Sequence, residues 1–507
     1  MGISREHSEV DITRNRTVTT EDGVTIYYDI YEPKNNDSPK YGVIVGHGFT
    51  ASKESMHLTS LALAESGFVV VSLDFRGHGR SGGSLGTGSR DNTEELTRDI
   101  LAVKTYLDNR DDVIRDNYGI IGHSMGGRAA FSACVNHDPF TRMVGIAPAV
   151  NHDFIVKDRP QDLLIISAEY DALFPPEINR DIVSVRHDVR EEDVEYNNIY
   201  RQNETTTKIT IIDNTDHLTV LWASSTHVEI NNWFVASYGM DDVQTRTQRI
   251  NLYTVIWILS ASAAFFTVVY LINGDDATEV GEPSDFKKLS KDYFLYSFLF
   301  AIPGFLIFSP LLLLPTINTA IYMIILSGSF LGTTYLIHKK TEDTIKDTFK
   351  RYLNGSISDY IYGGLCGFSL VAMVHISVSS HYLNLTLIGP RFVYFCITAV
   401  ILFFFFSTDN TFFFDIGSGL SPMKNIALYS SFKSIYVVTI MIAASLMAMG
   451  SYYMIPYAVG LFVIIGAVSV MIHRYSGSKI VPSVAVSILI GSIFVSVTAI
   501  FDPMSIL

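Results

Sequence analysis

Cysteine is scarce in this sequence: its 507 residues include only three. They lie far apart, at Cys134, Cys366 and Cys396. Three scattered cysteines exclude a disulfide framework and a cysteine-rich zinc site as the basis of the fold. Because only Cys134 lies in the first 250 residues, that part of the chain has no internal disulfide.

The second half of the chain lacks net charge. Residues 251–507 hold 13 acidic and 13 basic side chains, whereas residues 1–250 hold 38 acidic and 24 basic ones, so the whole formal charge of −14 lies in the first half. An acidic first half gives no sign of a nucleic-acid surface. The chain is too long for one ordinary core, so we expect at least two domains.

Long apolar runs are what the second half has instead. Residues 251–273 contain no charged side chain and are long enough to cross about 30 Å of hydrocarbon as a helix. We count eight such runs, the others at roughly 293–315, 317–337, 360–380, 392–407, 434–450, 452–472 and 480–500. Soluble core helices would leave no polar face for water. Residues 250–507 are therefore predicted to form a helical transmembrane domain of about eight spans, in contact with a lipid bilayer.

A few polar residues interrupt these runs. His375 lies within one, Arg391 lies at the start of another, and Asp409 and Asp415 flank aromatic runs. We interpret most of them as interfacial, with an ion or proton path as the alternative. One span would be enough for anchoring, so transport or lipid handling by this half stays open.

The first half alternates between strand and helix patterns. Helix 92–109 is the clearest, since Leu96, Ile100, Val103 and Leu107 recur on one face. Strands are predicted at 23–33, 41–50, 68–73, 118–124, 143–149, 162–171 and 208–213, and the other helices at 53–66, 125–137 and 217–237. This alternation predicts an α/β domain over residues 1–240, with a mostly parallel sheet covered on both faces.

Ser124 lies between a predicted strand and a predicted helix, in the sequence GHSMGG at 122–127. Glycines on both sides allow the sharp turn that exposes a nucleophilic hydroxyl. A G-x-S-x-G sequence also occurs by chance, in which case Ser124 is only a turn residue. The choice between these depends on the partners of the serine.

A serine hydroxyl needs a base, and His217 is the candidate because it follows the last predicted strand. Asp171 follows the strand 162–171 and is expected to orient the imidazole. The chain order Ser, Asp, His is one of those found among serine, histidine and acid triads. Asp213 and Asp216 are alternatives for the acid, although neighbours on one loop seldom reach the ring nitrogen that faces away from the serine.

Four motifs together resemble the α/β-hydrolase superfamily, in particular its serine aminopeptidase and monoacylglycerol-lipase-like branch. They are HGFT at 47–50, DFRGHGRSGG at 74–83, GHSMGG at 122–127, and the pair SAEYDALFPP and DHLTV around Asp171 and His217. The resemblance covers about residues 17–238. It implies an oxyanion hole formed by the backbone N–H groups of Phe49 and Met125.

The same resemblance assigns bracing roles to His47, His78, His123, Asp74 and Arg76. The sequence contains no cluster of metal ligands and no phosphate-binding glycine loop, so we predict no metal and no cofactor.

The segments that shape substrate pockets in related enzymes are unusual in this chain. Only the residues 150–161 separate two strands where a helical cap is often inserted. The charged segment 178–207 is expected to be a mobile surface excursion rather than an apolar lid. An open site of this kind suits short esters, amides or a substrate supplied by the membrane.

The sequence thus predicts a membrane-bound serine hydrolase that cleaves an ester or amide, with lipid acyl esters and small peptides among the candidates. The alternative is a membrane transport or sensing protein with a non-catalytic hydrolase-like domain. The first residues lack the apolar core of a signal peptide, which favours a cytoplasmic hydrolase domain. The basic residues of the segment 338–359 favour the opposite side, by the positive-inside rule.

Overall fold

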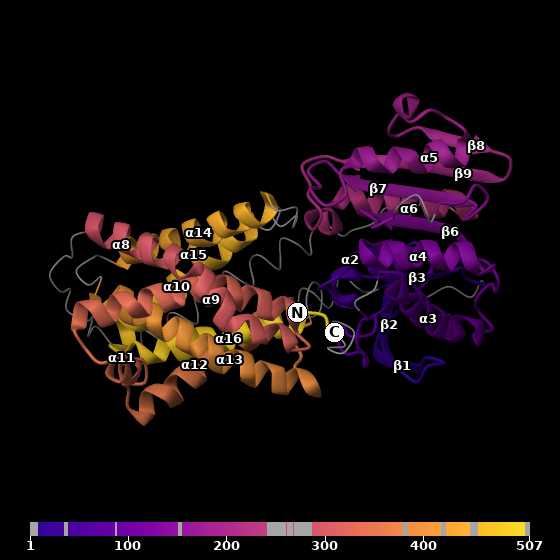
Figure 1. The fold of residues 1–507 in the computed structure, drawn as a ribbon. Coiled ribbons are helices and arrows are strands. Elements are labelled where there is room, and N and C mark those ends of the chain that lie inside the picture. Colours follow the sequence, from indigo (N-terminus) through magenta and orange to yellow (C-terminus); the bar gives the residue numbers. More distant parts are fainter. Residues whose placement is uncertain are drawn as a thin grey trace. The chain divides into compact units, whose positions relative to one another are not determined.

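The computed structural model describes residues 9–34, 39–86, 89–150, 155–240, 286–378, 384–416, 422–446 and 455–501, and the single positions 260 and 267. The chain folds into two compact units, drawn in Figure 1. The first, here called the hydrolase unit, consists of Met1–Val255, Val378–Thr386 and Ala499–Leu507, and the second, the helical unit, of Ile256–Ser377 and Leu387–Thr498. The hydrolase unit therefore uses three separate parts of the chain. The sequence-based domains, residues 1–240 and 250–507, stay predictions.

A nine-stranded sheet forms the centre of the hydrolase unit. Its spatial order is β1-β2-β4-β3-β5-β6-β7-β9-β8. The strands are β1 Val10–Thr19, β2 Thr25–Pro33, β3 Gly42–Gly46, β4 Val69–Leu73, β5 Tyr118–His123, β6 Phe140–Ile146, β7 Asp162–Ala168, β8 Ile199–Gln202 and β9 Thr205–Ile212. From β4 to β9 the neighbouring strands are parallel, whereas β1, β2 and β8 pair antiparallel. The predicted α/β fold with a mostly parallel sheet is confirmed.

Helices cover both faces of this sheet, so its central strands are apolar throughout. Ile44 of β3 packs in one apolar cluster with side chains of α3, α4 and α5. Its neighbours Val43 and Val45 pack in a second cluster with α2 and α6. These helices are α2 His57–Glu65, α3 Ser89–Asp108, α4 Met125–Asn136, α5 Arg180–His187 and α6 Ser224–Tyr238. The alternation follows from the period of two in a strand, and burial on both faces explains the continuous Val and Ile runs.

The segment 178–207 folds differently from the expectation. It forms α5, the short turns Pro176–Asn179 and Glu191–Asp193, and the edge strand β8. Ile182 and Val183 of α5 are 1% and 0% exposed. Arg186 is also buried, and its guanidinium donates hydrogen bonds to main-chain carbonyls, those of Val156, Arg159 and Pro160. The expectation of a mobile excursion is therefore wrong, because a few apolar side chains and one buried arginine fasten the segment to the sheet.

The helical unit consists of helices throughout the part that the structure describes. They are α8 Phe286–Leu299, α9 Ala301–Phe308, a 3-10 turn Ser309–Leu313, α10 Ile317–Thr341, α11 Ile345–Tyr352, α12 Ile357–Val378, α13 Pro390–Asn410, a π-helical turn Thr411–Ile416, α14 Pro422–Leu446, α15 Ile455–Ser476 and α16 Ile480–Val497. Six of them are long and apolar enough to cross a membrane. A further pair, Lys287–Leu299 and Ala301–Leu313, is bent by 46° and is either a broken span or a re-entrant loop.

Seven of the eight predicted runs overlap with these helices or with the bent pair, although the helix that meets the run 434–450 begins at Pro422. The eighth, 251–273, lies outside the described residues except at positions 260 and 267. The count for the described part is six or seven, so the total of eight stays a prediction.

A buried ion pair lies in the helical unit. Asp409 Oδ1 is 2.6 Å from Lys433 Nζ, and these residues are 3% and 4% exposed. Lys433 also donates to Ser329 Oγ at 2.7 Å. Arg391 is buried as well and donates to the carbonyls of Val495 and Thr498. Asp409 and Arg391 are therefore enclosed by protein, and the interfacial interpretation missed their partners.

Candidate active site

The chain turns sharply at Ser124, between β5 and α4. Ser124 has φ 50° and ψ −113°, a conformation that side-chain-bearing residues rarely adopt. Its N–H donates to the carbonyl of Ile146 at 3.0 Å, and its own carbonyl accepts from Ala149 N at 3.0 Å. These two bonds tie the turn to the end of β6, so the strained conformation is held by the neighbouring strand.

Two glycines are needed for this turn. A Cβ on Gly122 would lie 2.2 Å from the carbonyl oxygen of Gly126, and a Cβ on Gly126 would lie 2.5 Å from that of His47. Neither position leaves room for a side chain, because the obstructing atoms belong to the backbone. The glycines of the motif are thus explained by close packing around Ser124, as expected for a nucleophile-bearing turn.

His217 and Asp171 lie together although 46 residues separate them. Nδ1 of His217 is 2.8 Å from Oδ2 of Asp171, and both residues are buried. The other carboxylate oxygen, Oδ1, accepts the N–H groups of Leu173 and Phe174, each at 2.9 Å. The carboxylate is therefore fixed by two main-chain donors and directs one oxygen at the imidazole.

Of the two alternative acids, Asp216 accepts hydrogen bonds from main-chain groups and Asp213 is exposed. Asp216 Oδ1 accepts the N–H groups of Leu218 and Thr219, at 3.0 and 2.8 Å, and so caps the turn after His217. The partner of the imidazole is Asp171.

The loop His47-Gly48-Phe49 lies against Ser124. A Cβ on Gly48 would be 3.3 Å from Ser124 Cβ and 2.4 Å from His123 Nδ1. His47 Nε2 accepts the N–H of Phe75 at 3.1 Å, so its Nδ1 carries the proton and donates to the Gly48 carbonyl at 2.7 Å. Burial lowers the pKa of His47, which keeps this tautomer neutral.

The hydrogen bond from His47 Nδ1 to the Gly48 carbonyl fixes the orientation of the peptide plane between Gly48 and Phe49. In a trans peptide the carbonyl and the following N–H point in opposite directions. Because the Gly48 carbonyl is directed at His47, the N–H of Phe49 points away from that ring. Met125 is the first residue of α4, where main-chain N–H groups have no helical acceptor. The two predicted oxyanion donors are thus both main-chain groups held by local structure.

His123 braces the same region from the other side. Its Nε2 lies 2.9 Å from the carbonyl of His217, so this nitrogen donates, and the ring spans the turns that carry Ser124 and His217. Burial and the neighbouring His217 lower the pKa of His123 to about 3. The ring of His123 is therefore neutral at ordinary pH, and its hydrogen bond to the His217 carbonyl holds the two turns in place.

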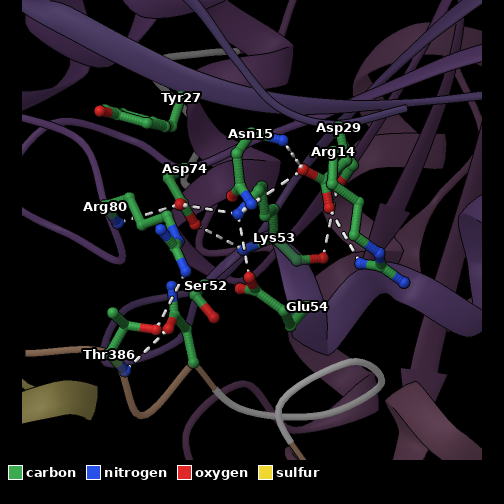
Figure 2. Close-up of polar contacts among 12 residues, drawn as sticks. Arg14, Asn15, Tyr27, Asp29, Ser52, Lys53, Glu54, Asp74, Arg80 and Thr386 are labelled. Carbon is green, nitrogen blue, oxygen red and sulfur yellow. Dashed lines mark hydrogen bonds and ion pairs between the residues drawn. The ribbon is translucent and has the colours of Figure 1, made fainter. Parts of the chain in front are cut away.

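A buried charge cluster follows the same loop and is drawn in Figure 2. Lys53 is fully buried, with Nζ 2.9 Å from Glu54, 3.3 Å from Asp74 and 3.7 Å from Asp29. Burial alone would lower the pKa of Lys53, but the carboxylates of Asp74, Glu54 and Asp29 more than offset this and leave it raised. Asp74 also accepts the N–H groups of Lys53 and Arg80, at 2.8 and 3.0 Å. The cluster thereby joins the chain after Phe49 to the glycine-rich segment 74–83.

Arg76 fastens the start of that segment. Its guanidinium donates to Asp99 at 2.7 Å and to Asp22 at 2.7 Å. Burial raises the pKa of Asp99 to about 6, with Arg76 acting in the opposite direction. The bracing roles implied for Asp74 and Arg76 match these contacts. Among the described residues no group of three or more His, Cys, Asp or Glu side chains is arranged to hold a metal ion.

Residues 37–255 match the model of a protein family described as serine aminopeptidase, S33. The hydrolase unit is an α/β hydrolase. The membership predicted for residues 17–238 is confirmed by this match over residues 37–255, and the fold of the unit agrees with it.

Several curated proteins are similar to this unit. A monoacylglycerol lipase of Mycolicibacterium smegmatis is 32% identical over 138 residues, which are 26% of this chain and 45% of the lipase. A bifunctional esterase/perhydrolase DCH of Acinetobacter calcoaceticus is 33% identical over 26% of this chain and 43% of its own. A bis(hydroxyethyl) terephthalate hydrolase of Streptomyces coelicolor is 28% identical over 31% and 47%. The chain thus spans less than half the length of each of these relatives.

The sequence did not reveal the bracing partners around the site. Lys53 and Asp29 were not singled out, since a lysine after a loop is ordinarily solvated. Only the acidic Glu54 beside Lys53 and the motif residue Asp74 hinted that a cation would be needed.

Proposed function

We propose that the protein is a membrane-bound serine hydrolase that cleaves an ester or amide through an acyl-enzyme. The observation that carries this proposal is the 2.8 Å contact of His217 Nδ1 with Asp171 Oδ2, in a unit whose strained turn presents Ser124. Three similar proteins carry the names of a monoacylglycerol lipase, an esterase/perhydrolase and a bis(hydroxyethyl) terephthalate hydrolase. These names support an ester as the bond that is cleaved.

In the proposed reaction Ser124 Oγ attacks the carbonyl carbon while His217 Nε2 takes the hydroxyl proton. Asp171 holds the imidazole in the required tautomer and stabilises its charged form. The oxyanion accepts the N–H groups of Met125 and Phe49. The C–O or C–N bond then breaks as His217 returns the proton to the leaving group. Water, activated by the same histidine, releases the acid and regenerates Ser124.

A lipid-derived acyl ester is the substrate class that the helical unit favours. Six helices of the described part are long and apolar enough to cross a membrane, so the protein is proposed to be a multi-pass membrane protein. Tethering to a bilayer raises the effective concentration of a substrate dissolved in it without any new contact.

The connectivity supports this membrane arrangement. The helices α13, α14, α15 and α16 separate two segments of the hydrolase unit, Val378–Thr386 and Ala499–Leu507. Four crossings return a chain to the side on which it started. The cytoplasmic side expected for the hydrolase unit stays a prediction, and the basic residues of α11 weigh against it because one crossing, α12, separates α11 from Val378–Thr386.

Hydrolysis of a water-soluble ester by the purified full chain tests the proposal. Ser124→Ala and His217→Ala should each reduce kcat/KM by up to about 10⁶-fold, and the double variant should lose no more than either alone. Ser132→Ala is the matched control: this serine lies in α4, the helix that follows Ser124, and its hydroxyl accepts a hydrogen bond from Thr97 at 3.1 Å. A Ser124→Ala protein that keeps a tenth of the wild-type rate would contradict the proposal.

A further inference from the structure

The residues that follow α16 are part of the hydrolase unit. Ile500 N donates to the carbonyl of Gly77 at 2.8 Å, and the carbonyl of Ile500 accepts from Leu85 N at 2.8 Å. Phe501 and Leu85 form a parallel bridge. Ala499 is 0% exposed and belongs to the apolar cluster that α3 and α4 share with the sheet. The segment 499–501, here called the tail, is thus paired by backbone and by side chain.

The glycine-rich segment 74–83 is shaped to receive this tail. Gly77 has φ +69°, and a Cβ on it would lie 2.7 Å from the carbonyl oxygen of Ile500. A side chain at this position would therefore strike the tail backbone. The positive φ of Gly77 favours glycine by itself, and the tail backbone is the nearest obstruction to a side chain there.

The ring of Phe501 lies next to the loop expected to hold the oxyanion. Its centroid is 5.8 Å from that of Phe49, and the Phe49 ring is 5.9 Å from His78. Phe49 is 37% exposed, an unusual position for a large apolar ring beside a turn that carries Ser124. Phe49 also follows Gly48, the residue packed against Ser124. The two phenyl rings thus form a continuous apolar surface that begins at the oxyanion loop.

We propose that Phe501 is a specificity-determining residue of the hydrolase site and that, with Phe49, it binds the apolar acyl or alcohol group of the ester. The proposal rests on the proposed function. In this arrangement a residue that follows the last predicted membrane span completes a site built on residues 47–217. The preferred substrates are then esters with an alkyl or aromatic group of several carbons, rather than acetates.

The competing explanation is that the tail has a purely structural role. Esters with apolar groups of increasing length distinguish this role from substrate binding. A structural role predicts equal losses on all esters when Phe501 is changed. A binding role predicts a loss that grows with the apolar group, because only a long group reaches the ring. The measured quantity is the ratio of kcat/KM for p-nitrophenyl octanoate to that for p-nitrophenyl acetate, with the full chain in nanodiscs and the esters below their aggregation limits.

Phe501→Ala should lower this ratio by about 10-fold while acetate hydrolysis changes less than 2-fold, the size expected when a pocket loses apolar contact. Phe501→Leu, which keeps an apolar side chain and is less disruptive to folding, should give an intermediate ratio. Equal losses on both esters, or an unchanged ratio in both variants, would overturn the proposal. A wild-type protein that hydrolyses neither ester would instead remove the proposed function.

Gly77→Ala tests the same inference without touching the rings. Its new methyl group should displace the tail and lower the octanoate to acetate ratio in the same direction as Phe501→Ala. Gly239→Ala is the matched control, because Gly239 also has a positive φ of +64°, but no described atom lies within 4 Å of the place that a methyl group would take there. If the two glycine variants change the ratio equally, backbone strain rather than the tail is responsible, and the inference fails.

Discussion

Two buried aspartates, one in each unit, are enclosed to the same degree and are stabilised in opposite ways. Asp171 and Asp409 are both 3% exposed. Asp171 is held by two main-chain N–H groups and by His217, which is charged only when it carries an extra proton. Asp409 faces the ammonium group of Lys433 at 2.6 Å.

These two environments affect the charges of the two carboxylates differently. Main-chain dipoles solvate the charge of Asp171 without neutralising it, so the charge remains available when His217 takes a proton. The charge of Asp409 is already balanced by Lys433, because an ion buried without a partner is costly. We therefore propose that Asp171 supports chemistry, whereas Asp409 and Lys433 hold helices α13 and α14 together.

The difference between the two aspartates is tested by neutralising each of them in turn. Asp171→Asn should reduce kcat by about 10⁴-fold with the fold intact, because the wrong imidazole tautomer is favoured. Asp409→Asn should leave ester hydrolysis in water within a few-fold of wild type. The measurement is hydrolysis of p-nitrophenyl acetate by both variants.

Asp216→Asn serves as the control for the first of these changes. Asp216 adjoins His217 in sequence but caps a turn, so its loss should cost far less activity than that of Asp171. If Asp216→Asn were the more damaging variant, the assignment of the acid would be wrong.

Removal of the Lys433 ammonium group should have a smaller effect than the loss of Asp171, and this effect should be limited to the stability of the helical unit. Lys433→Met leaves the Asp409 carboxylate buried without its partner and should destabilise the helical unit by about 3–5 kcal/mol. The double variant Lys433→Met/Asp409→Leu should recover most of this loss, since an apolar pair replaces the ions. Activity on a soluble ester should change little in either protein.

The reaction of a thiol dye with Cys366 during heating reports this stability, because Cys366 is buried in the helical unit. Cys134→Ala and Cys396→Ala remove the other two thiols from the signal, the buried one of the hydrolase unit and the exposed one of the helical unit. A double variant that melts as low as Lys433→Met would mean that the pair does more than neutralise charge.

Local patterns in the sequence were sufficient for most of the hydrolase unit. Strands such as β3 and β4 are short continuous apolar runs, and the amphipathic helix α3 has Leu96 and Ile100 on its buried face. The motifs around Ser124, Asp171 and His217 have the order of the family. These features depend on neighbouring residues, which a sequence displays directly.

What the sequence could not supply depends on distant partners. The edge strand β1 is rich in charged residues and pairs only on one side, so its pattern is weak. The tail Ala499-Ile500-Phe501 joins Gly77 and Leu85 across more than 400 residues. The ion pair of Asp409 with Lys433 likewise needs two helices to be brought together. Nothing within any one of these segments predicts its partner.

The proposal that Ser124 is an activated nucleophile is tested by the reaction of the protein with a fluorophosphonate. The full chain is treated in nanodiscs, digested, and the modified peptide identified by mass spectrometry. We predict a single adduct on Ser124, formed at a rate that falls steeply in His217→Ala and is absent in Ser124→Ala. No adduct in a folded wild-type protein, or an adduct on another serine that persists in Ser124→Ala, would contradict it.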